Sequence, residues 1–64
     1  MQACWTVVAK RGINSNIPQG FKVTNVVTPT ESHDYPSLAR RLKDMGIPEP
    51  GGTQNDDWWE WRRQ

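Results

Sequence analysis

Three residues of this chain could together form a nucleophilic site. Cys4 supplies a thiol, His33 an imidazole and Asp34 a carboxylate. A thiol becomes a strong nucleophile when an imidazole, oriented by a carboxylate, removes its proton. Nothing in the sequence fixes the distance of Cys4 from the other two, and the chain has one histidine and no nucleophile elbow. We therefore expect Cys4 to be a small residue of a sheet and His33 a solvated residue at a helix entry, in a protein that is not an enzyme.

A second group of residues could bind a hard cation. Asp56, Asp57 and Glu60 are carboxylates close together in the sequence, but their spacing matches no calcium-binding loop. Charges placed before an edge strand commonly prevent aggregation, which is the simpler interpretation. The pair Gly51-Gly52 lacks the lysine and the helix of a phosphate-binding loop. We expect no metal, no cofactor and no small-molecule substrate.

Composition limits the remaining possibilities. The chain has 64 residues, of which 34% are hydrophobic, so one small core is expected. A single cysteine excludes an intramolecular disulfide, and one cysteine with one histidine cannot complete a structural zinc site. A domain with so little core gains stability from large side chains, here four tryptophans, or from a second subunit.

Charge and hydropathy set the expected location and partners. Eight basic and seven acidic residues give a net charge of +1, which does not favour strong non-specific binding of nucleic acid. No segment approaches the roughly 20 apolar residues of a membrane span. The first residues lack the basic leader of a signal peptide. We expect a cytoplasmic protein that does not enter a membrane.

The chemistry-bearing residues must be positioned by a few regular elements, the first of which is a strand over residues 4–10. Its β-branched and aromatic residues alternate with a period of two. One face carries Trp5, Val7 and Ala9, and the other carries Cys4, Thr6 and Val8. In the loop that follows, residues 17–20 suit a type I turn, and either Ile13 or Ile17 is expected to return to the core.

A second strand is expected over residues 21–28, ended by Pro29. Phe21 and Val23 point inward, and Lys22 and Thr24 point outward. The alternation breaks at Asn25. Either a β-bulge at this residue returns Val26 to the inner face, or Val27 stays in register and Asn25 lies at an edge.

A helix is expected over residues 34–45, with Ser32 or Asp34 as its N-cap. Its apolar stripe consists of Tyr35, Leu38, Ala39, Leu42 and Met45. Gly46 has the position of a left-handed residue after the helix, and Ile47 could contact Leu42 as in a Schellman motif.

A third strand is expected over residues 58–63. Alternation places Trp59, Trp61 and Arg63 on one face and Trp58, Glu60 and Arg62 on the other. The element order ββαβ predicts an α+β fold in one domain, residues 1–64. A right-handed crossover gives a three-stranded antiparallel sheet of order 2-1-3, with the helix packed on one face.

The segment IPQGFKVTNVVTP, an amphipathic helix ending at Gly46 and a tryptophan-rich last strand together cover most of the chain. This pattern resembles short single-domain proteins of unknown function from gut Bacteroidetes and their mobile elements. The resemblance implies a bacterial protein with a ββαβ fold, and it implies no activity and no site residues.

The sheet face opposite the helix is the candidate interaction surface. It is expected to carry Thr6, Val8, Lys22, Thr24, Trp58 and Arg62. An exposed tryptophan is typical of interface hot spots, so Trp58 suggests a homodimer or another protein partner bound through the open face or an edge strand. The alternative is a small nucleic-acid-binding protein that uses the same face. A register shift of one residue would turn Trp58 inward and expose Trp59 and Trp61.

Overall fold

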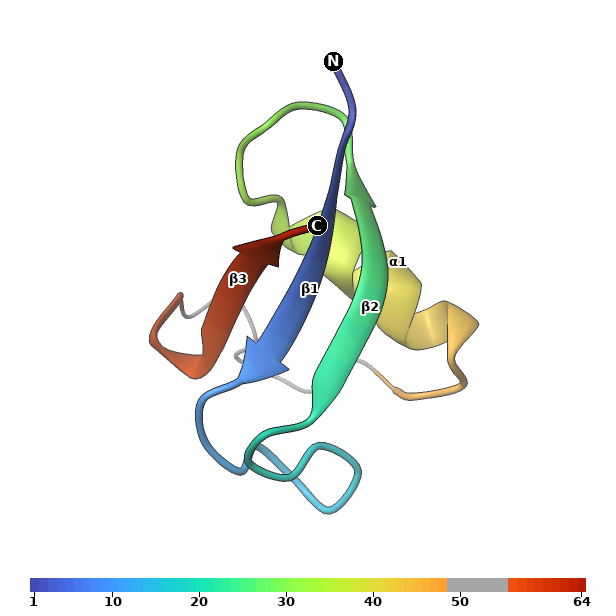
Figure 1. Cartoon of the computed structure of the whole chain (residues 1–64). Coiled ribbons are helices and arrows are strands. Elements are labelled where there is room, and N and C mark those ends of the chain that lie inside the picture. Colours follow the sequence, from blue (N-terminus) through green and yellow to red (C-terminus); the bar gives the residue numbers. More distant parts are fainter. Residues whose placement is uncertain (49–55) are drawn as a thin grey trace.

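The computed structural model describes residues 1–48 and 56–64. The elements are β1 (Ala3–Ala9), β2 (Lys22–Thr28), α1 (Tyr35–Asp44), the 3-10 helix η1 (Asp56–Trp58) and β3 (Trp59–Arg63). The three strands form an antiparallel sheet of order β2-β1-β3, and α1 lies against one face of it (Figure 1). The predicted α+β fold and strand order are confirmed, and the element ends differ from the predicted ends by at most one residue.

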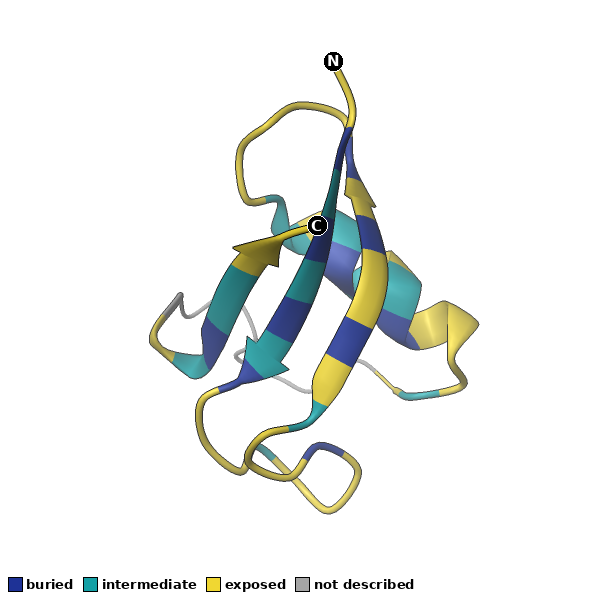
Figure 2. Ribbon diagram, viewed as in Figure 1, coloured by how far each residue is buried: buried dark blue, intermediate teal, exposed yellow. Residues whose placement is uncertain are grey.

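The alternation predicted for β1 is the basis of the two-layer structure. Trp5, Val7 and Ala9 are buried on the face of the sheet that α1 covers, and the side chains between them in the sequence are half-buried (Figure 2). Leu38 and Leu42 of α1 are fully buried in the same cluster. Burial of one such leucine stabilises a fold by about 1.5–3 kcal/mol relative to its exposed state.

A β-bulge in β2 resolves the two alternatives at Asn25. Trp5 pairs with Val26 and Val7 pairs with Val23, so one residue of β1 faces two residues of β2. Asn25 has a left-handed backbone, with φ of 60°, which asparagine tolerates better than a β-branched residue does. Val26 is consequently 0% exposed and Val27 is 50% exposed.

The helix ends follow their capping signals. Asp34 is the N-cap, and its carboxylate accepts hydrogen bonds from the amide and the hydroxyl of Ser37. At the other end, Gly46 has φ of 78°, and the Ile47 amide donates to the Leu42 carbonyl at 2.9 Å. The Gly46 amide also donates to the Lys43 carbonyl at 3.0 Å, and these two bonds form the Schellman motif predicted there.

Two local predictions were wrong. Met45 is 39% exposed instead of buried, because the helix ends at Asp44 and Met45 is the C-cap. The turn before β2 also lies one residue later than predicted. The Phe21 amide donates to the Pro18 carbonyl, and Gly20 has φ of 83°, which is the third-position geometry of a type II turn and not of type I.

The long loop between β1 and β2 is held by its own apolar side chain. Ile17 is fully buried, and Ile13 is half-buried against the same core. The predicted return of an isoleucine to the core is therefore confirmed. Neither helix in the described part of the chain has the length and apolar character needed to cross a bilayer.

Candidate functional site

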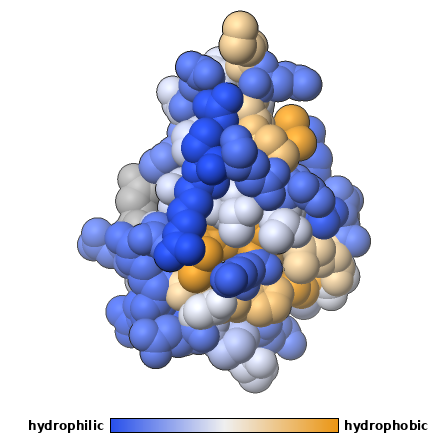
Figure 3. All heavy atoms as spheres, viewed as in Figure 1, coloured by the Kyte–Doolittle hydropathy of each residue, from blue (hydrophilic) through white to orange (hydrophobic). Residues whose placement is uncertain are grey.

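The open face of the sheet carries most of the predicted interaction surface. Val8 of β1 lies between Lys22 of β2 and Glu60 of β3, and Thr6 lies beside Arg62. Thr24 is exposed at the bulge. Viewed from this side, hydrophilic side chains surround small hydrophobic patches (Figure 3). The face is therefore mixed in character and has no large apolar area.

Trp58 is not the residue opposite Val8, so its predicted place beside Val8 is wrong. It belongs to η1 and not to the third strand, which begins at Trp59. Glu60 is the residue that faces Val8. The Trp58 ring is half-buried against the core, with the Arg11 guanidinium carbon 5.9 Å from its centroid. Trp58 lies one residue before β3, and its carbonyl accepts from the Lys10 amide at 2.8 Å.

Several polar groups of the open face are bonded to one another. The Arg62 guanidinium lies 2.6 Å from a carboxylate oxygen of Glu60. The side-chain amide of Gln64 donates to the Thr6 hydroxyl at 2.9 Å, and its oxygen accepts from the Cys4 thiol at 2.7 Å. These contacts join the end of the chain to the central strand and leave Arg62 with a local counter-charge.

The residues of the possible nucleophilic site are not brought together. Cys4 bonds to Gln64 on the open face, and Asp34 is occupied as a helix cap. The His33 ring instead contacts Trp5 and Trp61, which belong to the covered side of the sheet. The three groups therefore lie on different sides of β1 and do not form a nucleophile–base pair.

The possible cation site is only partly described. Glu60 is paired with Arg62, and Asp57 is exposed and has an interaction partner. The side chain of Asp56 and the pair Gly51-Gly52 lie outside the described residues. Among the described residues, no three histidine, cysteine or acidic side chains are grouped so as to hold a metal ion.

An aromatic cluster on the covered side was not predicted. The His33 ring is stacked on Trp61, with centroids 4.9 Å apart and planes at 8°, and it meets Trp5 edge-on at 5.0 Å. Trp5 and Trp61 are also perpendicular to each other, at 5.8 Å. The Arg63 guanidinium lies 5.6 Å from the Trp5 centroid and is paired with Glu31 at 3.2 Å. No periodic signal marks this cluster, because its members come from three separate segments.

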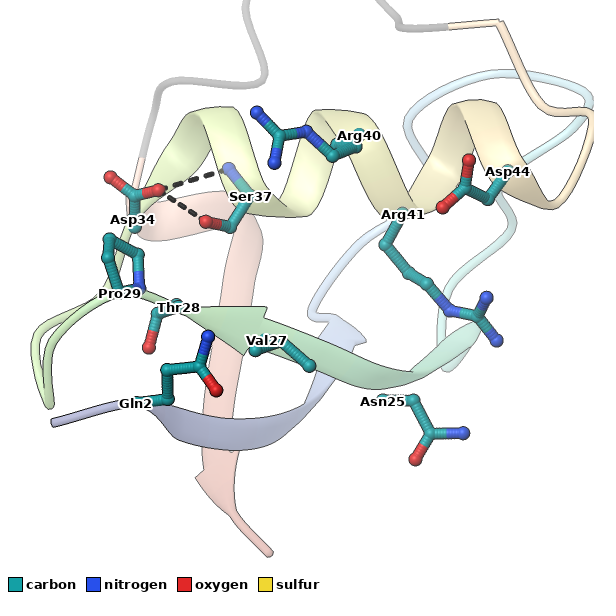
Figure 4. A pocket seen from close by; sticks show the side chains of 10 residues that line it. All are labelled: Gln2, Asn25, Val27, Thr28, Pro29, Asp34, Ser37, Arg40, Arg41 and Asp44. Atoms are coloured by element: carbon teal, nitrogen blue, oxygen red, sulfur yellow. Dashed lines mark hydrogen bonds between the residues drawn. The ribbon is translucent and has the colours of Figure 1, made fainter.

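The outer edge of β2 is protected against the addition of another strand. A groove of about 510 Å³ runs beside this edge, between β2 and α1 (Figure 4). Within it, Arg41 reaches from the helix and donates from Nε to the Thr24 carbonyl at 2.8 Å. The bulge at Asn25 further disturbs the row of backbone groups. A bulge and a basic side chain at the edge are both common means of preventing strand addition.

The outer edge of β3 differs from that of β2. The Lys10 amide donates to the Trp58 carbonyl, and the Gln64 amide donates to the Cys4 carbonyl. Trp58 and Gln64, which flank β3, therefore direct these backbone groups toward β1. Because successive residues of a strand alternate, the backbone groups of Trp59, Trp61 and Arg63 point away from the sheet. In the described part of the chain, no strand pairs with this edge and no bulge interrupts it.

Comparison of the chain with protein-family models, with curated proteins and with solved structures gave no match. The resemblance to short Bacteroidetes proteins therefore stays a prediction.

Proposed function

We propose that this protein is a non-enzymatic protein-interaction module that associates through its exposed sheet, with itself as a partner. The observation that carries the proposal is the contrast between the two sheet edges. The β2 edge is closed by Arg41 and by the bulge at Asn25. The β3 edge presents an uninterrupted row of donors and acceptors beside the half-buried ring of Trp61.

The small size of the domain supports the same proposal. The described core consists of only ten buried hydrophobic residues, and two of them, Ala3 and Ala9, have small side chains. Small domains with limited cores are commonly stabilised by a second subunit. Strand addition at β3 would extend the sheet without any rearrangement of the core.

The alternative function, binding of nucleic acid by the open face, has less support. Arg62 is held by Glu60 at 2.6 Å, and the Trp58 ring is half-buried against the core beside Arg11. Lys22 is exposed beside Val8 and favours the alternative. A labelled duplex distinguishes the two functions, since nucleic-acid binding must weaken steeply as salt is added.

Sedimentation equilibrium across a wide micromolar range tests the proposal. Reversible association, with a mass that rises with concentration, is the expected result. A strict monomer at the highest concentration, in particular one that binds the duplex at low salt, would contradict the proposal and favour the alternative.

A further inference from the structure

We propose that two copies of this chain join β3 to β3 in an antiparallel register centred on Trp61. The inference deepens the proposed function, on which it rests, by naming the surface, the partner and the register. Two three-stranded sheets then become one sheet of six strands. The order of charges along β3 and the direction of its backbone groups support this register.

The direction of the backbone groups restricts the possible registers. Trp59, Trp61 and Arg63 present their amides and carbonyls to the free edge, so these residues must face one another across an antiparallel junction. Three symmetric registers pair at least two of these three residues with residues of the second copy. Their two-fold axes pass through Glu60, Trp61 or Arg62.

Charge distinguishes the three registers. An axis through Glu60 places this carboxylate opposite its own copy, and an axis through Arg62 does the same for two guanidinium groups. Like charges directly opposite each other destabilise a sheet. An axis through Trp61 instead places Glu60 opposite the Arg62 of the second copy, twice. It also uses the full length of β3, from Trp59 to Arg63.

The side chains on the covered side fit the same register. Trp61 meets its own copy, and Trp59 lies opposite the Arg63 of the second copy. Trp61 is half-buried in the single chain, so the junction would shield ring surface that is now exposed. Arg63 already lies over the Trp5 ring at 5.6 Å, which shows that its guanidinium reaches aromatic rings on this side of the sheet.

Charge reversal and mixing test the register. Glu60→Arg places two like pairs across the junction, and so does Arg62→Glu, and both changes remove the Glu60–Arg62 contact within one chain. Each variant alone should therefore associate about tenfold or more weakly than the unchanged protein. When the two variants are mixed, opposite charges face each other at every position, and a mixed dimer should form.

Two controls separate register from stability and from general charge effects. The double variant Glu60→Arg with Arg62→Glu restores opposite charges across the junction and should regain self-association. Arg40→Glu alters an exposed charge on α1 and should leave association unchanged. Circular dichroism of each single variant reports whether it remains folded, and mixing of the two cannot restore association if either is unfolded.

The possible results distinguish the β3–β3 register from the proposed self-association on which it rests. Formation of the mixed dimer, measured by native mass spectrometry with one variant isotopically labelled, supports the register. If the unchanged protein associates but folded single variants associate equally well, the register is overturned and the proposed function stands. If the unchanged protein remains monomeric, both are overturned.

Discussion

The imidazole of His33 lies flat against the indole of Trp61, with ring centroids 4.9 Å apart and ring planes 8° from parallel. The same imidazole meets Trp5 edge-on at 5.0 Å. One side chain from the loop before α1 therefore contacts both the central strand β1 and the edge strand β3. Residues of β1 and β3 are thus joined to the helix entry by ring contacts and not by backbone pairing.

His33→Ala should lower the free energy of unfolding by about 1 kcal/mol, because it removes both ring contacts. Unfolding in urea, followed by tryptophan fluorescence, measures the change. His33→Phe is the matched control, since it keeps a flat ring in the same place and should retain most of the stability. Equal losses in the two variants would show that the stack contributes little.

Asp34→Ala should destabilise the protein by about 1 kcal/mol, since the Ser37 amide loses its capping acceptor. Thermal unfolding followed by circular dichroism measures the loss. Asp34→Ser retains a capping oxygen and should recover most of it. A stability unchanged by Asp34→Ala would be inconsistent with a capping role.

Val26→Ala and Val27→Ala form a matched pair that tests the bulge at Asn25. Val26 is fully buried, so its truncation should cost about 2 kcal/mol, whereas truncation of Val27 should change stability by less than about 0.5 kcal/mol. Chemical denaturation of both variants gives the comparison. The reverse order would place Val27 inward and exclude the bulge.

Thr28→Val should cost about 1–3 kcal/mol, because the buried Trp5 indole donates from Nε1 to the Thr28 hydroxyl at 2.9 Å. The loss comes from an indole N–H that has no acceptor after the change. Trp5→Phe combined with Thr28→Val removes both partners. A double-mutant cycle should therefore show that the effects of the two changes are far from additive.

The sequence predicted those features that depend on periodicity and on local capping. The alternation of Trp5, Val7 and Ala9 identified the buried face of β1, and Asp34 and Gly46 identified the helix ends. The sheet order followed from the handedness of the crossover. Each of these signals acts within one element or between consecutive elements.

The features that escaped prediction depend on where an element begins or on contacts between distant segments. Trp58 was assigned by alternation, but the chain is in a 3-10 turn at that residue. At Asn25 the sequence left two alternatives open, and the pairing of both Val23 and Val26 with β1 shows that the bulge is the one adopted. His33 was expected to be solvated, and it is exposed, but its stacking on Trp61 requires the third strand to be in place.

The position of β1 at the centre of the sheet has a consequence for how fast the chain folds. Its first neighbour, β2, follows after one loop, but its second neighbour is the last strand described, and Cys4 bonds to a residue 60 positions away. Contacts between such distant residues require a large loop to close before they contribute any stability. We expect a folding rate nearer to that of β-rich domains, in milliseconds to seconds, than to that of small helical bundles.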